Sequence, residues 1–99
     1  EDFRPWWEEL NSIRVSIQNG QKYVQRSNFN GAFGEYESIS EKYPYFSQVY
    51  YYMGIAKYKQ KDFQEAILFF ENALKIYPDY QKAKKALDSV KKKIAEIKY

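Results

Sequence analysis

The side chains that could do chemistry in this chain are carboxylates, lysines, serines and tyrosines, because its 99 residues include no histidine and no cysteine. That composition supplies no imidazole base, no thiol nucleophile, no disulfide and no Cys/His zinc site. Neighbouring carboxylates such as Glu8 and Glu9 diverge by about 100° on a helix, so spacing pairs none of them for acid–base catalysis. The sequence also lacks a glycine-rich phosphate-binding loop. We therefore expect a non-catalytic protein without metal ligands or a cofactor.

The composition predicts a single small folded domain. Hydrophobic residues make up 44% of the chain and aromatic residues 20%, which is enough to build a core at this length. No apolar run is long enough to span a membrane, and the first residues lack the apolar stretch of a signal peptide. The absence of cysteine fits the cytoplasm and the periplasm equally, so the compartment stays open.

The net charge of +3 has its origin in the last part of the chain. Residues 79–99 contain 7 lysines, 3 acidic residues and no arginine, which gives this segment a charge of +4. Lysine-rich segments can bind nucleic acid or other anionic surfaces, and this is one alternative function. The lysines spread around the polar arc of a predicted helix, however, which favours an ordinary solvated face or contacts with an acidic partner segment.

An internal repeat of 34 residues is the strongest pattern in the sequence. Each copy predicts two helices joined by a short turn. Small residues in these helices should let their backbones approach closely, while aromatic rings fill the adjoining space. The expected repeat positions are Gly20, Phe29, Ala32, Tyr36 and Pro44 in the first copy and Gly54, Phe63, Ala66, Phe70, Ala73 and Pro78 in the second.

Helical periodicity predicts about five helices in total. The second copy should contain helices over about residues 48–60 and 63–76, with Asp62 as N-cap of the later one and Pro78 behind it. We also expect a helix over about residues 5–26, because apolar residues recur there at intervals of three and four. A similar stripe after Pro78 predicts the last helix.

The two copies resemble the tetratricopeptide repeat, a 34-residue helix–turn–helix unit. The second copy carries the resemblance through Tyr50, Met53, Gly54, Phe63, Ala66, Phe70, Ala73 and Pro78. The first copy departs from the pattern at Ser16 and Asn19, where large apolar residues are usual. The resemblance implies an all-α array that mediates protein–protein interaction and ends in a capping helix. It divides one domain, residues 1–99, into an N-terminal cap or helix extension, two repeats and a capping helix: 1–12, 13–46, 47–80 and 81–99.

In this family, the first helices of the repeats line a concave face that binds partner segments. Carried over to this sequence, that face would contain Arg14, Ile17, Gln21, Val24, Gln48, Tyr51, Ile55, Tyr58, Lys82 and Lys85. Tyr51 and Tyr58 share a helical side that is offset from the packing stripe, so we expect partly exposed anchors there, whereas Tyr50 should face the core. The two lysines favour a partner segment that contains both acidic and apolar residues.

A second interface is expected at the N-terminus if residues 1–12 do not cap the first repeat. Phe3, Trp6 and Trp7 would then form an exposed aromatic patch, which usually marks a partner site or a self-association site. Frequent Lys, Tyr, Ile and Asn with little alanine hint at an AT-rich bacterial genome, and family analogy then suggests an envelope or secretion assembly. A purely structural segment of a larger protein is the remaining alternative.

Overall fold

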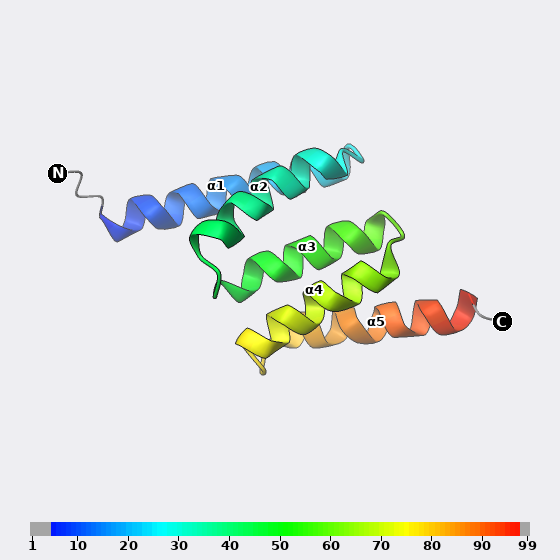
Figure 1. The fold of residues 1–99 in the computed structure, drawn as a ribbon. Helices are drawn as coiled ribbons and strands as arrows, with labels where there is room; N and C mark the ends of the chain where they lie inside the picture. The colour runs from blue at the N-terminus through cyan, green and yellow to red at the C-terminus, as the bar shows by residue number, and fades with distance from the viewer. Residues whose placement is uncertain (1–4, 98–99) are drawn as a thin grey trace.

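The computed structural model describes residues 5–97, which form five α-helices joined by short turns (Figure 1). The predicted all-α fold is confirmed, and no β-strand occurs in this range. Within residues 5–97, no helix is long and apolar enough to cross a membrane. The helices are α1 (Trp6–Gln25), α2 (Phe29–Lys42), α3 (Ser47–Lys59), α4 (Phe63–Ile76) and α5 (Gln81–Ile97).

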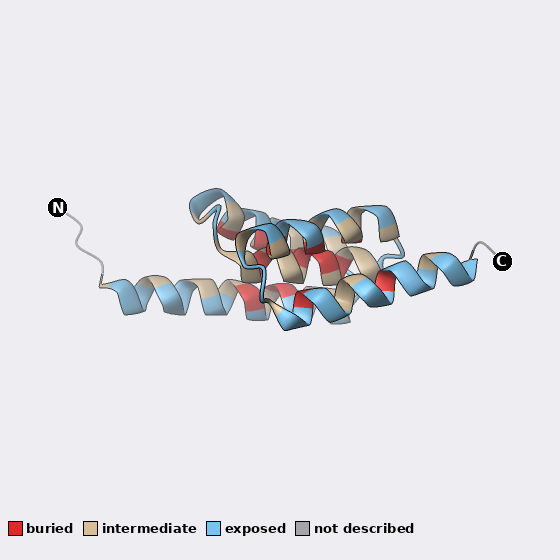
Figure 2. Cartoon of the chain, turned by 90° about the horizontal axis from the view of Figure 1, so that it is seen from below, coloured by how far each residue is buried: buried red, intermediate tan, exposed pale blue. Residues whose placement is uncertain are grey.

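The first helix is one uninterrupted α-helix, as its apolar spacing predicted. Pro5 precedes it, and Glu8 and Glu9 lie in its first turn, where carboxylates interact favourably with the helix dipole. The antiparallel neighbour α2 ends at Lys42, whose Nζ lies 3.8 Å from Oε1 of Glu9. The residues of α1 before Glu9 therefore project beyond the other helices (Figures 1 and 2).

The same turn joins the helices of both pairs. Ser27 and Lys61 have left-handed backbones with φ of 59° and 67°. The amides of the following residues, Asn28 and Asp62, donate hydrogen bonds of 2.8 and 2.9 Å to carbonyls five residues earlier, which is a Schellman arrangement. The side chains of Asn28 and Asp62 then accept from backbone amides three residues later, at 3.1 and 3.4 Å. Each turn thus ends one helix and caps the next, and the prediction of Asp62 as N-cap is confirmed.

Close packing within each helix pair depends on a glycine facing an aromatic ring. A Cβ atom on Gly54 would lie 2.5 Å from a ring carbon of Phe70, far inside van der Waals contact, and one on Gly20 would approach Tyr36 more closely still. The rings of Phe70 and Tyr36 are fully buried. Glycine and ring therefore make the same contact in both pairs, where any larger residue would push the helices apart.

The core consists of two clusters on either side of α3. The first cluster combines α1, α2 and α3 around Tyr36, Val49 and Ala56, and the second combines α4 and α5 around Phe70 and Val90. Because α3 contacts all four other helices, it is apolar on nearly every side. Figure 2 shows buried residues in the middle of the molecule and exposed ones towards the N-terminal end of α1 and the C-terminal end of α5.

Candidate partner-binding face

Helices α1, α3 and α5 together form one side of the molecule, which we call the A-helix face. The middle helix α3 contacts both of the others. One pocket of about 400 Å³ lies between α3 and α5, and two of about 410 and 430 Å³ lie between α1 and α3. The pockets form a continuous row, because Tyr51 and Ile55 line the first and second while Gln21 and Tyr52 line the second and third.

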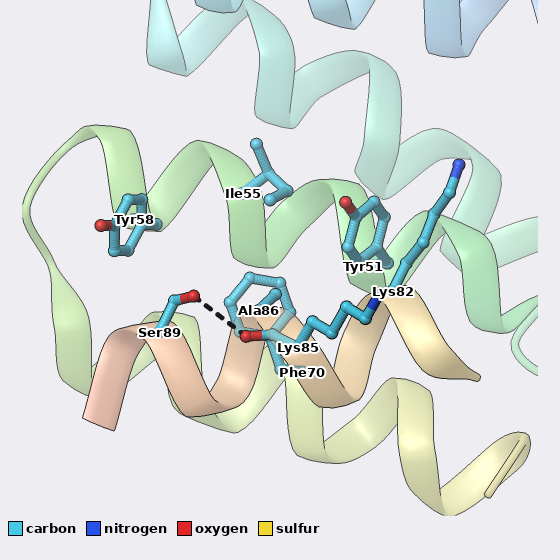
Figure 3. A pocket seen from close by; sticks show the side chains of 8 residues that line it. All are labelled: Tyr51, Ile55, Tyr58, Phe70, Lys82, Lys85, Ala86 and Ser89. Carbon is cyan, nitrogen blue, oxygen red and sulfur yellow. Dashed lines mark hydrogen bonds between the residues drawn. The ribbon is translucent and has the colours of Figure 1, made fainter. Parts of the chain in front are cut away.

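The pocket between α3 and α5 combines an apolar wall with a basic one (Figure 3). Tyr51, Ile55 and Tyr58 follow one another along α3 at intervals of about one helical turn, so they point to the same side. All three side chains are half-buried. Phe70 of α4 is fully buried and lies at the bottom of the pocket. A partner side chain entering here would meet mainly aromatic and aliphatic surface.

Two exposed lysines supply the positive charge of this pocket. Lys82 and Lys85 lie at its Tyr51 end, whereas Ser89 lies nearer to Tyr58 (Figure 3). The hydroxyl of Ser89 donates a 3.0 Å hydrogen bond to the carbonyl of Lys85, so its proton is already used within α5. Neither lysine forms an ion pair with an acidic side chain of residues 5–97. Both ammonium groups can therefore receive a carboxylate from outside.

A series of tyrosine rings connects this pocket to the first repeat. The ring centroid of Tyr51 lies 5.4 Å from that of Tyr52 and 5.5 Å from that of Tyr80. Tyr52 in turn stacks on Tyr36 at 6.0 Å. Aromatic pairs of this kind contribute roughly 0.5–1.5 kcal/mol each beyond the area that they bury. The floor of the A-helix face is therefore held in place by ring contacts between α2, α3 and the start of α5.

The hydroxyl groups of these tyrosines have raised pKa values. Burial, followed by repulsion from the phenol of Tyr52, raises the pKa of Tyr36 to about 12. Burial raises the pKa of Tyr80 to about 12, with smaller contributions from Tyr52 and Tyr51. The pKa of Tyr51 is raised by the same two causes as that of Tyr36. The floor of the face therefore stays uncharged well above neutral pH.

The two pockets between α1 and α3 are lined by amide and apolar side chains. We call the pocket of about 410 Å³ the inner pocket and the one of about 430 Å³ the outer pocket. Gln21 is exposed and borders both, and Val24 lies beside it in the inner pocket. Arg14 and Gln48 border the outer one from opposite helices. Ile17 also borders the outer pocket but is only 8% exposed, because it belongs to the first core cluster. Its contribution to the face is therefore smaller than its spacing suggested.

The ten residues that the sequence placed on the concave face all line one of these three pockets. Tyr50 packs against the first core cluster, as expected, but it is only half-buried, and its hydroxyl donates a 2.9 Å hydrogen bond to the carbonyl of Pro44. Sequence reasoning missed Tyr52 and Tyr80 as pocket or floor residues. The repeat spacing could have found Tyr80, which follows Pro78 at the same distance as Phe46 follows Pro44.

The expected repeat positions fall into three groups in the structure. Gly20, Ala32, Tyr36, Gly54, Ala66, Phe70 and Ala73 are buried between helices. The remaining positions are the half-buried Phe29 and Phe63, which begin α2 and α4, and the exposed Pro44 and Pro78, which follow the ends of those helices. The small and aromatic positions therefore make the helix contacts, and the prolines lie in the turns.

The second interface expected at the N-terminus involves the projecting start of α1. Trp6 and Trp7 are 70% and 55% exposed, and their rings lie edge to face with centroids 5.8 Å apart. Phe3 lies outside the described residues. A pocket of about 750 Å³ separates the start of α1 from the turn between α2 and α3, and Trp6 and Tyr45 are among the residues that line it. Both tryptophans thus lie in the first turn of α1.

A comparison with known protein families finds a match in the middle of the chain. The family model for the tetratricopeptide repeat matches residues 47–80, which include α3 and α4 with their Gly54–Phe70 contact. No curated protein matches the sequence. In the part of the chain from residue 5 to residue 97, no group of three or more acidic side chains is placed to hold a metal ion.

Proposed function

We propose that this chain binds a partner protein segment on its A-helix face. The chain is a tetratricopeptide-like repeat array, because residues 47–80 match that repeat and the helices before and after them continue its arrangement. Tetratricopeptide repeats typically act as non-catalytic protein–protein interaction modules. The observation that carries the proposal is the continuous row of three pockets along α1, α3 and α5. Half-buried rings with polar tips, as found there, suit the centre of a protein interface.

The proposal includes the division of the chain into units. Residues 13–46 and 47–80 form the two repeats, and the last unit, residues 81–99, contains the capping helix α5. The equivalent turns at Ser27 and Lys61 support this division, because their left-handed backbones occupy the same place in each repeat. Of residues 1–12, those from Trp6 onward extend the first helix of the first repeat in this division, since α1 runs without interruption from Trp6 to Gln25.

The chemistry of the pocket between α3 and α5 supports a partner segment with an apolar side chain beside an acidic one. Tyr51 and Ile55 offer apolar surface, while the ammonium groups of Lys82 and Lys85 stand at one end. Each exposed ion pair would contribute only about 0.2–1 kcal/mol, so apolar contact supplies most of the affinity. The lysines would chiefly select among partners and speed their association.

A peptide library displayed on phage tests the proposal directly. We expect selection on the chain to enrich peptides in which an aromatic or aliphatic residue neighbours Asp or Glu. The double variant Lys82→Glu with Lys85→Glu should bind an enriched acidic peptide about 10-fold or more weakly, because two attractions become repulsions. Isothermal titration calorimetry with that peptide measures the change.

The matched control makes the same charge change on the other side of α5. Lys84 and Lys91 are exposed and lie about 200° and 180° around the helix from Lys82. Lys84→Glu with Lys91→Glu should leave both the selection and the affinity nearly unchanged. Equal losses in the two double variants, or enriched peptides without acidic residues, would contradict the proposed chemistry of the pocket.

Binding to nucleic acid or another anionic surface through α5 is the alternative function, and the placement of its lysines favours it less. Lys84 and Lys91 face away from Lys82, and Nζ of Lys93 lies 4.0 Å from a carboxylate oxygen of Glu96. A salt titration separates the two functions, since binding to phosphates falls steeply with salt whereas mainly apolar binding does not. The setting in a bacterial envelope or secretion assembly remains a hypothesis from composition and analogy, and mass spectrometry of captured partners tests it.

A further inference from the structure

The projecting start of α1 carries an aromatic surface that adjoins one end of the A-helix face, where Leu10 also lines the pocket of about 430 Å³. Four side chains, each more than half exposed, make up what we call the N-terminal patch: Trp6, Trp7, Leu10 and Tyr45. The patch borders the pocket of about 750 Å³ between α1 and the turn after α2. Concentrated apolar surface of this kind usually marks an interface rather than a surface in contact with water.

Within residues 5–97, no helix lies antiparallel to the first turn of α1. The rest of α1 pairs with α2, but α2 ends beside Glu9, where Nζ of Lys42 lies 3.8 Å from the carboxylate. A second copy of α1 that runs antiparallel to the first would fill this place. It would gain the same neighbour in return, so the surface is complementary to itself.

The charges around the N-terminal patch allow two copies to approach. Glu8 lies about 200° around the helix from Trp6 and so points away from the patch. Glu9 borders the patch, but its charge is paired with that of Lys42. Among the residues that the structure describes, therefore, no unpaired charge within the patch keeps two such surfaces apart. They also offer little attraction to the lysine-rich end of α5, which argues against head-to-tail association.

The area of the patch is sufficient for a weak dimer. Aromatic side chains bury about 150–250 Å² each, so the exposed parts of Trp6, Trp7 and Tyr45 together with Leu10 amount to roughly 500 Å² per copy. A symmetric pair would then bury about 1,000 Å², which is the lower end of the range for specific protein interfaces. Such an area fits association in the micromolar range or weaker.

We infer that the chain forms a weak symmetric dimer in which the N-terminal patches of two copies cover each other. The two α1 helices run antiparallel along their first turns, and each patch contacts the same patch of the other copy. This arrangement closes after two copies, and it leaves the pocket between α3 and α5 open in both, because no residue of the N-terminal patch lines that pocket. The inference stands independently of the proposed binding of a partner segment.

The two tryptophans provide a direct test, because they are the only tryptophans of the chain and both belong to the patch. Sedimentation equilibrium from about 10 µM to about 1 mM should show a mass that rises from 12.0 kDa towards twice that value and no further. Tryptophan emission should shift to shorter wavelength over the same range, since the indole rings leave water on association.

Matched variants locate the interface. Leu10→Glu should weaken dimerisation at least about 10-fold, because it places a charge in the middle of the patch. Leu68→Glu makes the same change at a leucine of α4 that is 55% exposed, close to the 53% of Leu10, and should leave dimerisation unchanged. Far-ultraviolet circular dichroism checks that both variants remain helical. Trp6→Ala, at the first residue of α1, is a second test should Leu10→Glu fail to fold.

Three results would overturn the inference. The first is a single species of 12.0 kDa at every concentration with constant tryptophan emission, which would leave the patch to another partner. The second is association that continues beyond two copies and weakens with salt, as head-to-tail contacts with the lysines of α5 would produce. The third is that the Leu10→Glu and Leu68→Glu variants dimerise with the same dissociation constant.

Discussion

Two glycines of α2 that are three residues apart have opposite surroundings. A Cβ atom on Gly34 would meet nothing within 4 Å, whereas one on Gly31 would lie 2.9 Å from a ring carbon of Tyr23. Neither glycine has a positive φ, so both already adopt helical backbones. Only the contact with Tyr23 gives a glycine a packing role here, and Gly34 costs the helix conformational entropy without return.

Replacing Gly34 by alanine should therefore stabilise the protein by about 0.5–1 kcal/mol, because it restricts the unfolded chain and creates no clash. Gly31→Ala is the matched variant, and steric conflict with Tyr23 should cancel or reverse its gain. Equilibrium unfolding in urea measures both differences. A loss of stability in Gly34→Ala would contradict the prediction, because it would mean that the added methyl group meets other atoms.

Single residues on α3 were hard to assign from the sequence for a physical reason. Tyr50, Tyr51 and Tyr52 are all half-buried, because α3 has neighbours on nearly every side and no polar face points away from them. The spacing placed Tyr51 correctly beside Ile55 but gave no means to distinguish the surroundings of the three rings. Truncating Tyr51 would remove contacts with Phe70 and Tyr80, so we expect alanine there to lower stability as well as to change the pocket that Tyr51 lines.

At the scale of elements, the first helix of each pair ends in the same strained turn. Lys61 has a φ of 67°, and Ser27 has one of 59°, at the position where a Schellman turn usually has glycine. A residue with a Cβ atom in this conformation costs about 1 kcal/mol or more. Residues other than glycine thus occupy both turns at some cost to the stability of the helix ends.

Lys61→Gly should stabilise the protein by about 0.5–1 kcal/mol, because glycine adopts the left-handed conformation without steric penalty. Gln60→Gly is the control one residue earlier, where φ is −77° and the same substitution should instead destabilise by about 0.5–1 kcal/mol. Thermal unfolding followed by circular dichroism distinguishes the two signs. The prediction is wrong if Lys61→Gly melts at a lower temperature than the original chain.

The elements themselves were predictable because several signals agreed on each boundary. Helix α4 spans Phe63–Ile76, the same residues that the sequence predicted from Asp62 as N-cap and Pro78 behind it. For α3 the prediction was one residue late at each end, since Phe46 provides no side-chain cap that marks the start. Pairings between helices required the repeat spacing, which could not specify how far α1 projects beyond α2.

The molecule as a whole is extended, with dimensions of 59 × 30 × 17 Å. Its two core clusters lie one after the other along the chain, and α3 connects them. Repeat arrays of this kind gain stability from contacts between neighbouring units and can unfold locally. We therefore expect a substitution in one cluster to destabilise mainly the helices that form that cluster.

Val90→Ala should lower the free energy of unfolding of the second cluster by about 2 kcal/mol. Hydrogen-exchange protection should therefore fall more in α4 and α5 than in α1 and α2. Val90 is 1% exposed and belongs to the second cluster. Ile39→Ala, in the first cluster, should show the opposite distribution. Native-state exchange monitored by mass spectrometry resolves the helices, and an equal loss in all of them would reveal one fully cooperative unit.

Lys57 joins the two repeats through a part of α3 that lines none of the three pockets of the A-helix face. Its Nζ lies 4.6 Å from the ring centroid of Phe33 in α2 and 3.9 Å from a carboxylate oxygen of Asp62. A cation over an aromatic ring contributes about 0.5–1 kcal/mol or more when it is shielded from water. Because this contact spans a joint between units, it bears on the curvature of the array. We expect a chemical modification that neutralises this one amine to loosen the joint, and the spacing between α1 and α3 along the A-helix face should change with it.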